Sequence, residues 1–177
     1  MEHGVITLVN CTDEAPHEAS AYLKWRFGND KTRVDVTQVP APAEILANAK
    51  AYPREVEYIK KGIAMSVKNG SRVVVVAAHD GCRCNFVTKK KHLAQLGRSV
   101  DTLNFLKGEI GFEEAYGIWI DNAGEARELN SMRSEIAEME APLKFAANAQ
   151  RSISPEYVAL MRMHMKPGQL FFLDDLL

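Results

Sequence analysis

The most informative segment of this chain is Val73-Val-Val-Val-Ala-Ala-His-Asp-Gly-Cys82. Its first six residues form an uninterrupted apolar run, with the turn-forming residues Gly70-Ser71 before it and Gly81 after it. An apolar run of this length between turn signals is typical of a β-strand that is covered on both faces. The segment therefore predicts the central strand of a parallel sheet, followed at once by a histidine and a cysteine.

The sequence on both sides of this strand alternates between strand and helix patterns. Further strands are expected at three segments rich in β-branched or aromatic residues, 4–10, 33–39 and 115–120. Helical spacing of apolar residues predicts helices at 16–28, 56–67 and 88–107. Strands alternating with helices predict an α/β fold, a three-layer α/β/α domain with a mostly parallel central sheet of about four strands.

The carboxyl-terminal quarter of the chain has a different pattern. From Ser131 onward we expect two short helices, at 132–150 and 155–165, which form a C-terminal helical extension. No linker of disordered composition separates this extension from the sheet. The expectation is therefore a single α/β domain over residues 1–177, with a core at 1–130 and the extension at 131–177.

Composition narrows the class of protein. The chain has 177 residues, of which 46% are hydrophobic and 25% charged, as in an ordinary soluble domain. Lys and Arg number 22 against 23 Asp and Glu, which leaves no positive excess to attract nucleic acid or an anionic membrane. No apolar run approaches the ~20 residues of a transmembrane helix, and no secretory signal is recognisable. We therefore expect a cytoplasmic protein with no nucleic-acid or membrane partner, whose three cysteines are thiols.

Metal-binding side chains follow two of the predicted strands. Cys11, with Asp13 two residues later, ends the first strand, and His79 and Cys82 follow the apolar strand. Because ligands of parallel sheets collect beyond the carboxyl ends of the strands, these side chains should meet at one edge. Two sulfurs and one nitrogen suit Zn²⁺, which takes four tetrahedral ligands. The pattern predicts a zinc site of Cys11, His79 and Cys82, whose fourth position is open to water or taken by Asp13.

The same residues carry a resemblance to a known family. A strand-terminal Cys-x-Asp paired with His-x-x-Cys after an apolar strand resembles the β-class carbonic anhydrases, and more narrowly a small branch of them. The resemblance extends over roughly residues 4–122 and includes Ala21-Tyr-Leu-Lys-Trp-Arg-Phe-Gly28, Tyr58-Ile-Lys-Lys-Gly-Ile-Ala-Met-Ser-Val67 and Val73-Val-Val-Val-Ala-Ala-His-Asp-Gly-Cys-Arg-Cys-Asn85. It implies zinc ligands at Cys11, His79 and Cys82, hydration of carbon dioxide to bicarbonate by zinc-bound hydroxide, and assembly as homodimers or higher homo-oligomers.

Asp13 is the candidate catalytic residue, and its partner is the point at which this chain departs from the family. The resemblance implies that Asp13 orients the nucleophile while an arginine two residues later holds its carboxylate off the metal. Here that position is Ala15. Without a partner, Asp13 would be able to bind the metal and close the fourth position. Arg83, beside Cys82, is an alternative partner, although an arginine in such a place more often belongs to a surface salt bridge.

Three functional hypotheses remain open at this point. The first is a zinc-dependent, β-carbonic-anhydrase-like lyase that hydrates carbon dioxide or hydrolyses a related small molecule. The second is a non-catalytic zinc-binding protein on the same scaffold, because Ala15 stands where the arginine is expected. The third is a thiol-redox protein that uses Cys82 and Cys84.

Overall fold

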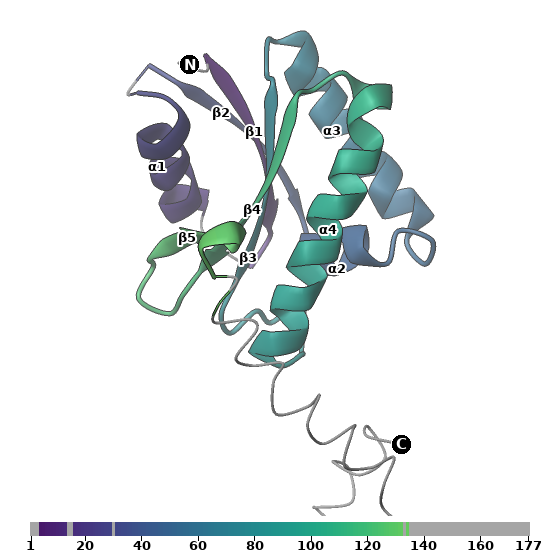
Figure 1. Ribbon diagram of the computed structural model, residues 1–177. Helices are drawn as coiled ribbons and strands as arrows, with labels where there is room; N and C mark the ends of the chain where they lie inside the picture. The colour runs from purple at the N-terminus through teal and green to yellow at the C-terminus, as the bar shows by residue number, and fades with distance from the viewer. Residues whose placement is uncertain (1–3, 14–15, 30, 133, 135–177) are drawn as a thin grey trace, which may run out of the picture. The chain divides into compact units, whose positions relative to one another are not determined.

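The computed structural model describes residues 4–13, 16–29, 31–132 and 134, and Figure 1 shows how their elements are arranged. The strands of this part of the chain form one sheet in the order β2-β1-β3-β4-β5. Their bounds are β1 Val5–Cys11, β2 Arg33–Val39, β3 Val73–His79, β4 Glu114–Ile120 and β5 Ala126–Glu128. Strands β1 to β4 are parallel, and β5 runs antiparallel to β4.

Helices cover both faces of the sheet (Figure 1). One face carries α1 (Pro16–Phe27), and the other carries α2 (Pro42–Ala47), α3 (Pro53–Lys68) and α4 (Lys89–Ile110). None of these helices combines the length and the apolar composition required to span a bilayer.

The expected fold class is confirmed, and two short elements are added to it. The layers and the mostly parallel sheet are as expected, but the described sheet has five strands instead of about four. Neither β5, with three residues, nor α2, with six, is long enough to display a periodic pattern in the sequence. A 3-10 helix covers Leu129–Met132, and the helices expected beyond it, to residue 165, fall almost entirely outside the described residues.

The strand order places β1 and β3 side by side in the interior of the sheet. Their register pairs Val9 with Val76, and both strands then run on in the same direction to Cys11 and His79. The chain passes from β1 to β2 on one side and later to β3 on the other, so the strand order reverses at this pair. Ligands of parallel α/β sheets bind beyond the carboxyl ends of the strands at such a reversal. The fold therefore places both residues where this class of protein builds its sites.

The sheet is held by burial on both of its faces. Every residue of β3 is buried, as its apolar run predicted. On one face, alternate residues of the parallel strands pack with Leu23 and Phe27 of α1. On the other, Gly117 lets α4 lie close to β4, since a Cβ there would come within 3.0 Å of Val100. Apolar burial, at about 25 cal/mol per Å², is the main stabilising term, and it gives the strand ends a rigid support.

Candidate metal centre

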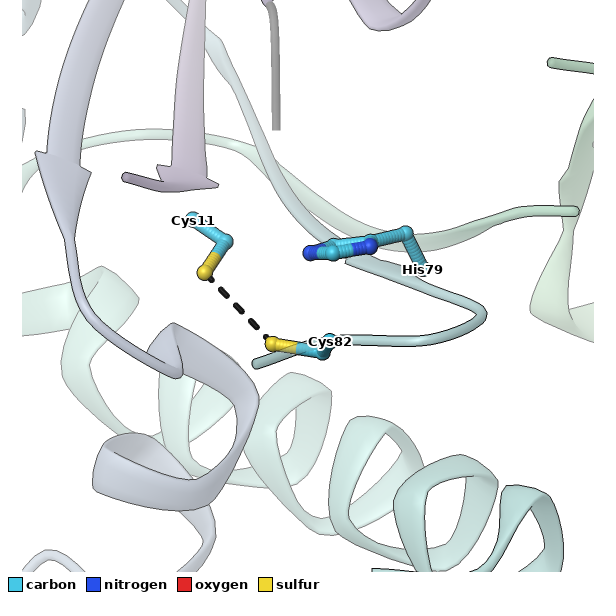
Figure 2. A group of neighbouring side chains, drawn as sticks. All are labelled: Cys11, His79 and Cys82. Atoms are coloured by element: carbon cyan, nitrogen blue, oxygen red, sulfur yellow. Dashed lines mark hydrogen bonds between the residues drawn. The ribbon is translucent and has the colours of Figure 1, made fainter. Parts of the chain in front are cut away.

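Three candidate ligands converge at the carboxyl ends of β1 and β3. Cys11 is the last residue of β1, His79 is the last residue of β3, and Cys82 lies in the loop that follows. Their side chains point toward one another (Figure 2), and the two sulfurs are 3.6 Å apart. The candidate ligand atoms all lie within 4.8 Å of one another, and all three residues are buried. In the described part of the chain, this group is the one arranged to hold a metal ion.

The loop after β3 shapes two of these three ligands. Gly81 occupies the left-handed region, with φ of +64°, a conformation that residues with a Cβ adopt at a cost. The turn at Gly81 brings the Cys82 thiol back toward the sheet. Nδ1 of His79 donates a hydrogen bond to the carbonyl oxygen of Asp80 at 2.9 Å. Because a carbonyl only accepts, Nδ1 carries a proton, and Nε2 is the nitrogen left to face the Cys11 thiolate or, when it is deprotonated, to bind a metal ion.

The donor set fits a tetrahedral metal ion. Two sulfurs bound at about 2.3 Å, with a tetrahedral angle between them, lie about 3.8 Å apart. The Sγ–Sγ distance of 3.6 Å between Cys11 and Cys82 is close to that separation. Two thiolates and one imidazole are typical ligands of Zn²⁺. Three protein ligands leave a fourth position, which is the pattern of catalytic zinc sites.

The two buried thiols differ in how readily they lose a proton. Burial raises the pKa of Cys11, but its hydrogen bond to His79 and bonds from the backbone amides of Asp13 and Ala41 outweigh this, and the pKa falls to about 7. Burial and the neighbouring Cys11 raise the pKa of Cys82 to about 12. At neutral pH about half of the Cys11 thiols are therefore ionised, while Cys82 keeps its proton. A metal ion would displace the remaining protons, since the thiolate is the form that binds metals.

Asp13 lies beside this group, and its carboxylate is bound by Arg83. Oδ1 of Asp13 accepts a hydrogen bond from Nε of Arg83 at 2.6 Å and forms an ion pair with Nη2 at 2.6 Å, and Oδ2 accepts the Arg83 backbone N–H at 2.7 Å. These bonds hold the pKa of the Asp13 carboxyl below its usual value. Of the two alternatives left open by Ala15, the structure therefore has Asp13 paired with Arg83. The loop after β3 supplies this arginine from 70 residues further along the chain.

Cys84 lies near this group without belonging to it. Its Sγ is 3.9 Å from the Thr12 hydroxyl, and the residue is partly exposed. Burial raises the pKa of its thiol. Cys82 directs its own sulfur toward Cys11, so the geometry favours a set of metal ligands over a Cys82–Cys84 redox pair.

A hollow of about 260 Å³ opens beside His79 and Cys82. Its walls come from the loop after β3, the start of α4 and the end of β4, and include Lys89, His92 and Trp119. His92 is buried and packs edge-on against Trp119 with ring centroids 5.3 Å apart, and burial lowers its pKa to about 4. Sequence spacing did not single out these wall residues, because they are brought together only when α4 packs on the sheet.

Comparison with known proteins identifies the family. The family model described as "Putative carbonic anhydrase" matches residues 1–130 of the chain. The chain belongs to this family. The resemblance carried by Cys-x-Asp and His-x-x-Cys is therefore confirmed, and the matched residues include all the strands described above and every candidate ligand of this carbonic anhydrase family member.

No curated protein matches this carbonic anhydrase family member. Among solved structures, it is similar to the β-carbonic anhydrase isoform I of the protozoan Trichomonas vaginalis, with 10% sequence identity and a TM-score of 0.48. That alignment covers 72% of this chain and 83% of the other. The family assignment rests on the match over residues 1–130.

Proposed function

We propose that this member of the carbonic anhydrase family is a zinc-dependent lyase that reversibly hydrates carbon dioxide to bicarbonate. The observation that carries the proposal is the convergence of Cys11, His79 and Cys82, whose ligand atoms lie within 4.8 Å of one another at the carboxyl ends of β1 and β3. The family match over residues 1–130 supports carbon dioxide as the substrate.

In the proposed reaction, zinc would activate the water and residues of the chain would orient it. Zinc, when held by the three side chains, lowers the pKa of a water toward ~7 and so makes hydroxide available at neutral pH. Asp13 accepts a hydrogen bond from the reacting water and directs an oxygen lone pair at the substrate carbon. Because Arg83 keeps the pKa of Asp13 low, the carboxylate stays ionised and orients the water without taking its proton. The water oxygen bonds to carbon, one carbon–oxygen π bond opens to give bicarbonate, and the proton leaves to buffer.

The hollow beside His79 and Cys82 supports a small substrate. Its volume of about 260 Å³ lies below the ~300–1,000 Å³ typical of pockets for drug-sized ligands. Lys89 lines the hollow, and its ammonium group is 3.9 Å from the Asp80 carboxylate. A cation on the wall would attract an anionic product such as bicarbonate.

Metal content and activity measured on one sample test the proposal. The reduced protein is analysed for zinc, and its hydration of carbon dioxide is followed by stopped flow from neutral to alkaline pH. We expect zinc in proportion to protein, together with turnover. Zinc without turnover would favour the non-catalytic zinc-binding alternative, and absence of metal from carefully reduced protein would contradict both.

Three variants test which residues bind the metal and which one orients the water. Cys11→Ala should lose zinc, because a structural or catalytic site with two remaining ligands binds zinc weakly. Asp13→Asn should keep zinc and lose activity, since an amide oxygen carries no charge to orient the water. Cys84→Ser is the matched control and should keep both, because its thiol lies outside the convergent group.

We further propose that the protein assembles as a homodimer or higher homo-oligomer. In the described sheet β2 is an edge strand, and exposed apolar side chains lie on it and on α3, at Val36, Tyr58 and Met65. Edge strands with exposed apolar neighbours are places where two copies can meet. Light scattering tests this, and the mass of a single chain would contradict it.

A cytoplasmic location completes the proposal. The two candidate thiol ligands bind a metal only in the reduced state, which the cytoplasm maintains. Fractionation of cells that express the tagged protein checks this, and recovery in a secreted fraction would contradict it.

A further inference from the structure

Arg83 makes contacts that metal binding alone does not require. Its side chain is 82% exposed and is not a candidate ligand, yet Arg83 makes two hydrogen bonds and a close ion-pair contact to Asp13. We infer that Arg83 is a positioning residue: it replaces the arginine absent at position 15 and holds the Asp13 carboxylate aside, so that the fourth metal position stays open. The inference rests on the proposed function, because it assigns a role within that same site.

The contacts of Arg83 with both carboxylate oxygens support this role. Arg83 binds Oδ1 of Asp13 through Nε at 2.6 Å, with its charged Nη2 also 2.6 Å from that oxygen, and it binds Oδ2 through its backbone N–H at 2.7 Å. Oδ1 would have to give up a charge-assisted hydrogen bond and an ion-pair contact before it bound a metal, so Arg83 disfavours closure of the site.

The contact between Arg83 and Asp13 is linked to the candidate ligands by the positions of both residues in the chain. Arg83 directly follows Cys82, and Asp13 comes two residues after Cys11. The Asp13 amide also donates to the Cys11 sulfur at 3.5 Å. The bonds between Asp13 and Arg83 therefore join the two segments that carry the sulfurs. Ala15 has only a methyl group and offers no donor for this purpose.

Substitutions at position 83 distinguish the contribution of the guanidinium group from that of the backbone N–H. Arg83→Ala removes the Nε hydrogen bond and the Nη2 ion-pair contact to Oδ1 of Asp13 and leaves the backbone bond to Oδ2. The freed Oδ1 is then able to complete a set of two sulfurs, one nitrogen and one oxygen, which is a closed site. Arg83→Lys supplies a single ammonium in place of the planar pair of donors, so its effect should be intermediate.

The first test measures anion binding at the fourth metal position and does not depend on catalysis. Cobalt(II) replaces zinc in the full-length protein, and thiocyanate is titrated while the visible spectrum is recorded. The wild type should bind the anion, and Arg83→Ala should bind it about tenfold more weakly or not at all. Arg33→Ala is the matched control. It removes another exposed arginine that pairs with an aspartate, Asp35 at 2.8 Å, and Arg33 lies at the amino-terminal end of β2, whereas the candidate ligands lie at the carboxyl ends of β1 and β3.

The second test measures hydration of carbon dioxide by the zinc-loaded proteins. Arg83→Ala should keep the wild-type zinc content while kcat falls roughly 10–100-fold, the usual loss when the partner of a metal-site residue is removed. The double variant Ala15→Arg/Arg83→Ala returns an arginine to the position that the family pattern predicts. It should recover most of the loss in both kcat and anion binding, which a merely structural role for Arg83 would not allow.

The outcomes distinguish this inference from the proposed function. Wild-type anion binding and kcat in Arg83→Ala would overturn the positioning role and leave the proposed function standing. A wild type that binds thiocyanate in an Arg83-dependent way but hydrates no carbon dioxide would overturn the activity and support the positioning role. A wild type that takes up no metal would overturn both.

Discussion

Cys11 and Cys82 carry the same thiol group 3.6 Å apart, yet one loses its proton near neutral pH and the other retains it. The difference in pKa comes from what each sulfur faces. Cys11 contacts His79 and the amides of Asp13 and Ala41, whereas Cys82 faces a buried environment and the thiolate of Cys11. Ala41 has a φ of +47°, a strained value for a residue with a Cβ. The strain at Ala41 accompanies an amide that helps to stabilise the Cys11 thiolate.

His92 is a second residue whose environment sets its charge. Burial, and to a smaller extent the charge of His79, lower its pKa from 6.5 to about 4. The unfolded chain therefore takes up a proton before the folded protein does as the pH falls. The stability that neutral His92 contributes is complete above pH 6.5 and is lost as the pH approaches 4.

His92 should therefore produce an acid-dependent loss of stability. Between pH 6.5 and pH 4, we expect the free energy of unfolding to fall by up to about 3 kcal/mol from this residue. His92→Phe keeps an aromatic ring against Trp119 and removes the titration, so its loss over this range should be smaller by that amount. Urea unfolding of reduced, chelator-treated protein at several pH values measures both. An equally steep loss in the two proteins would exclude His92 as the source.

At the scale of elements, the loop between β3 and α4 is the most important segment for the site. The carbonyl of Asp80 orients the His79 ring, Cys82 supplies a candidate ligand, and Arg83 binds Asp13. The Thr88 hydroxyl then accepts a hydrogen bond from the Lys91 amide at 3.3 Å and starts α4. A single short loop therefore orients the His79 ring, supplies Cys82, binds Asp13 and leads into the start of the next helix.

The packing of α3 on β2 depends on a glycine. A Cβ at Gly62 would come within 2.3 Å of the Thr37 hydroxyl and 3.2 Å of its Cβ. Gly62→Ala should destabilise the protein by about 1–3 kcal/mol through overpacking. That cost exceeds the gain of about 1 kcal/mol that alanine brings to a helix interior. The midpoint of urea unfolding measures the net effect.

Gly108 in α4 is the matched control for this prediction. A Cβ at Gly108 would meet nothing within 4 Å, so Gly108→Ala should gain up to about 1 kcal/mol of helix propensity without a packing cost. Opposite signs are expected for the two substitutions. A Gly62→Ala protein that is as stable as Gly108→Ala would show that α3 moves away from Thr37 at little cost.

At the scale of the whole molecule, a metal at this site would join segments that are far apart in the chain. Cys11 and Cys82 are separated by 71 positions and lie on different strands or loops. An unfolded chain does not hold these groups together, so it binds a metal weakly. The free energy of metal binding should therefore appear as added stability of the fold.

Zinc should raise the thermal stability by an amount that grows with the logarithm of its free concentration above Kd. Free zinc at a thousand times its Kd should add about 4 kcal/mol to the free energy of unfolding, and a chelator should remove it. Calorimetry of reduced protein with and without zinc measures the shift in Tm. Cys11→Ala should show no shift and Cys84→Ser the full shift. The same zinc-dependent shift in Cys11→Ala would contradict a site at these residues.

Several features of the molecule could be predicted from local sequence. The apolar run before His79 predicted a strand buried on both faces, because an uninterrupted run has no face that suits water. The strand-terminal positions of Cys11 and His79 predicted their meeting, because carboxyl ends of parallel strands share one edge. Both predictions depend on periodicity and chain direction, which are local properties of the sequence.

Other features were decided only by the tertiary structure. Local sequence offered Arg83 only as an alternative partner of Asp13, because their ion pair depends on the turn geometry at Gly81 together with the adjacency of β1 and β3. The hollow beside His79 also depends on the fold, because its walls come from separate elements. Local patterns report which face of an element is buried, but contacts between distant side chains depend on strand order, register and loop geometry together. For that reason the identity of the candidate ligands can be predicted along the chain, whereas the choice of Arg83 as the residue that binds Asp13 is decided by the fold.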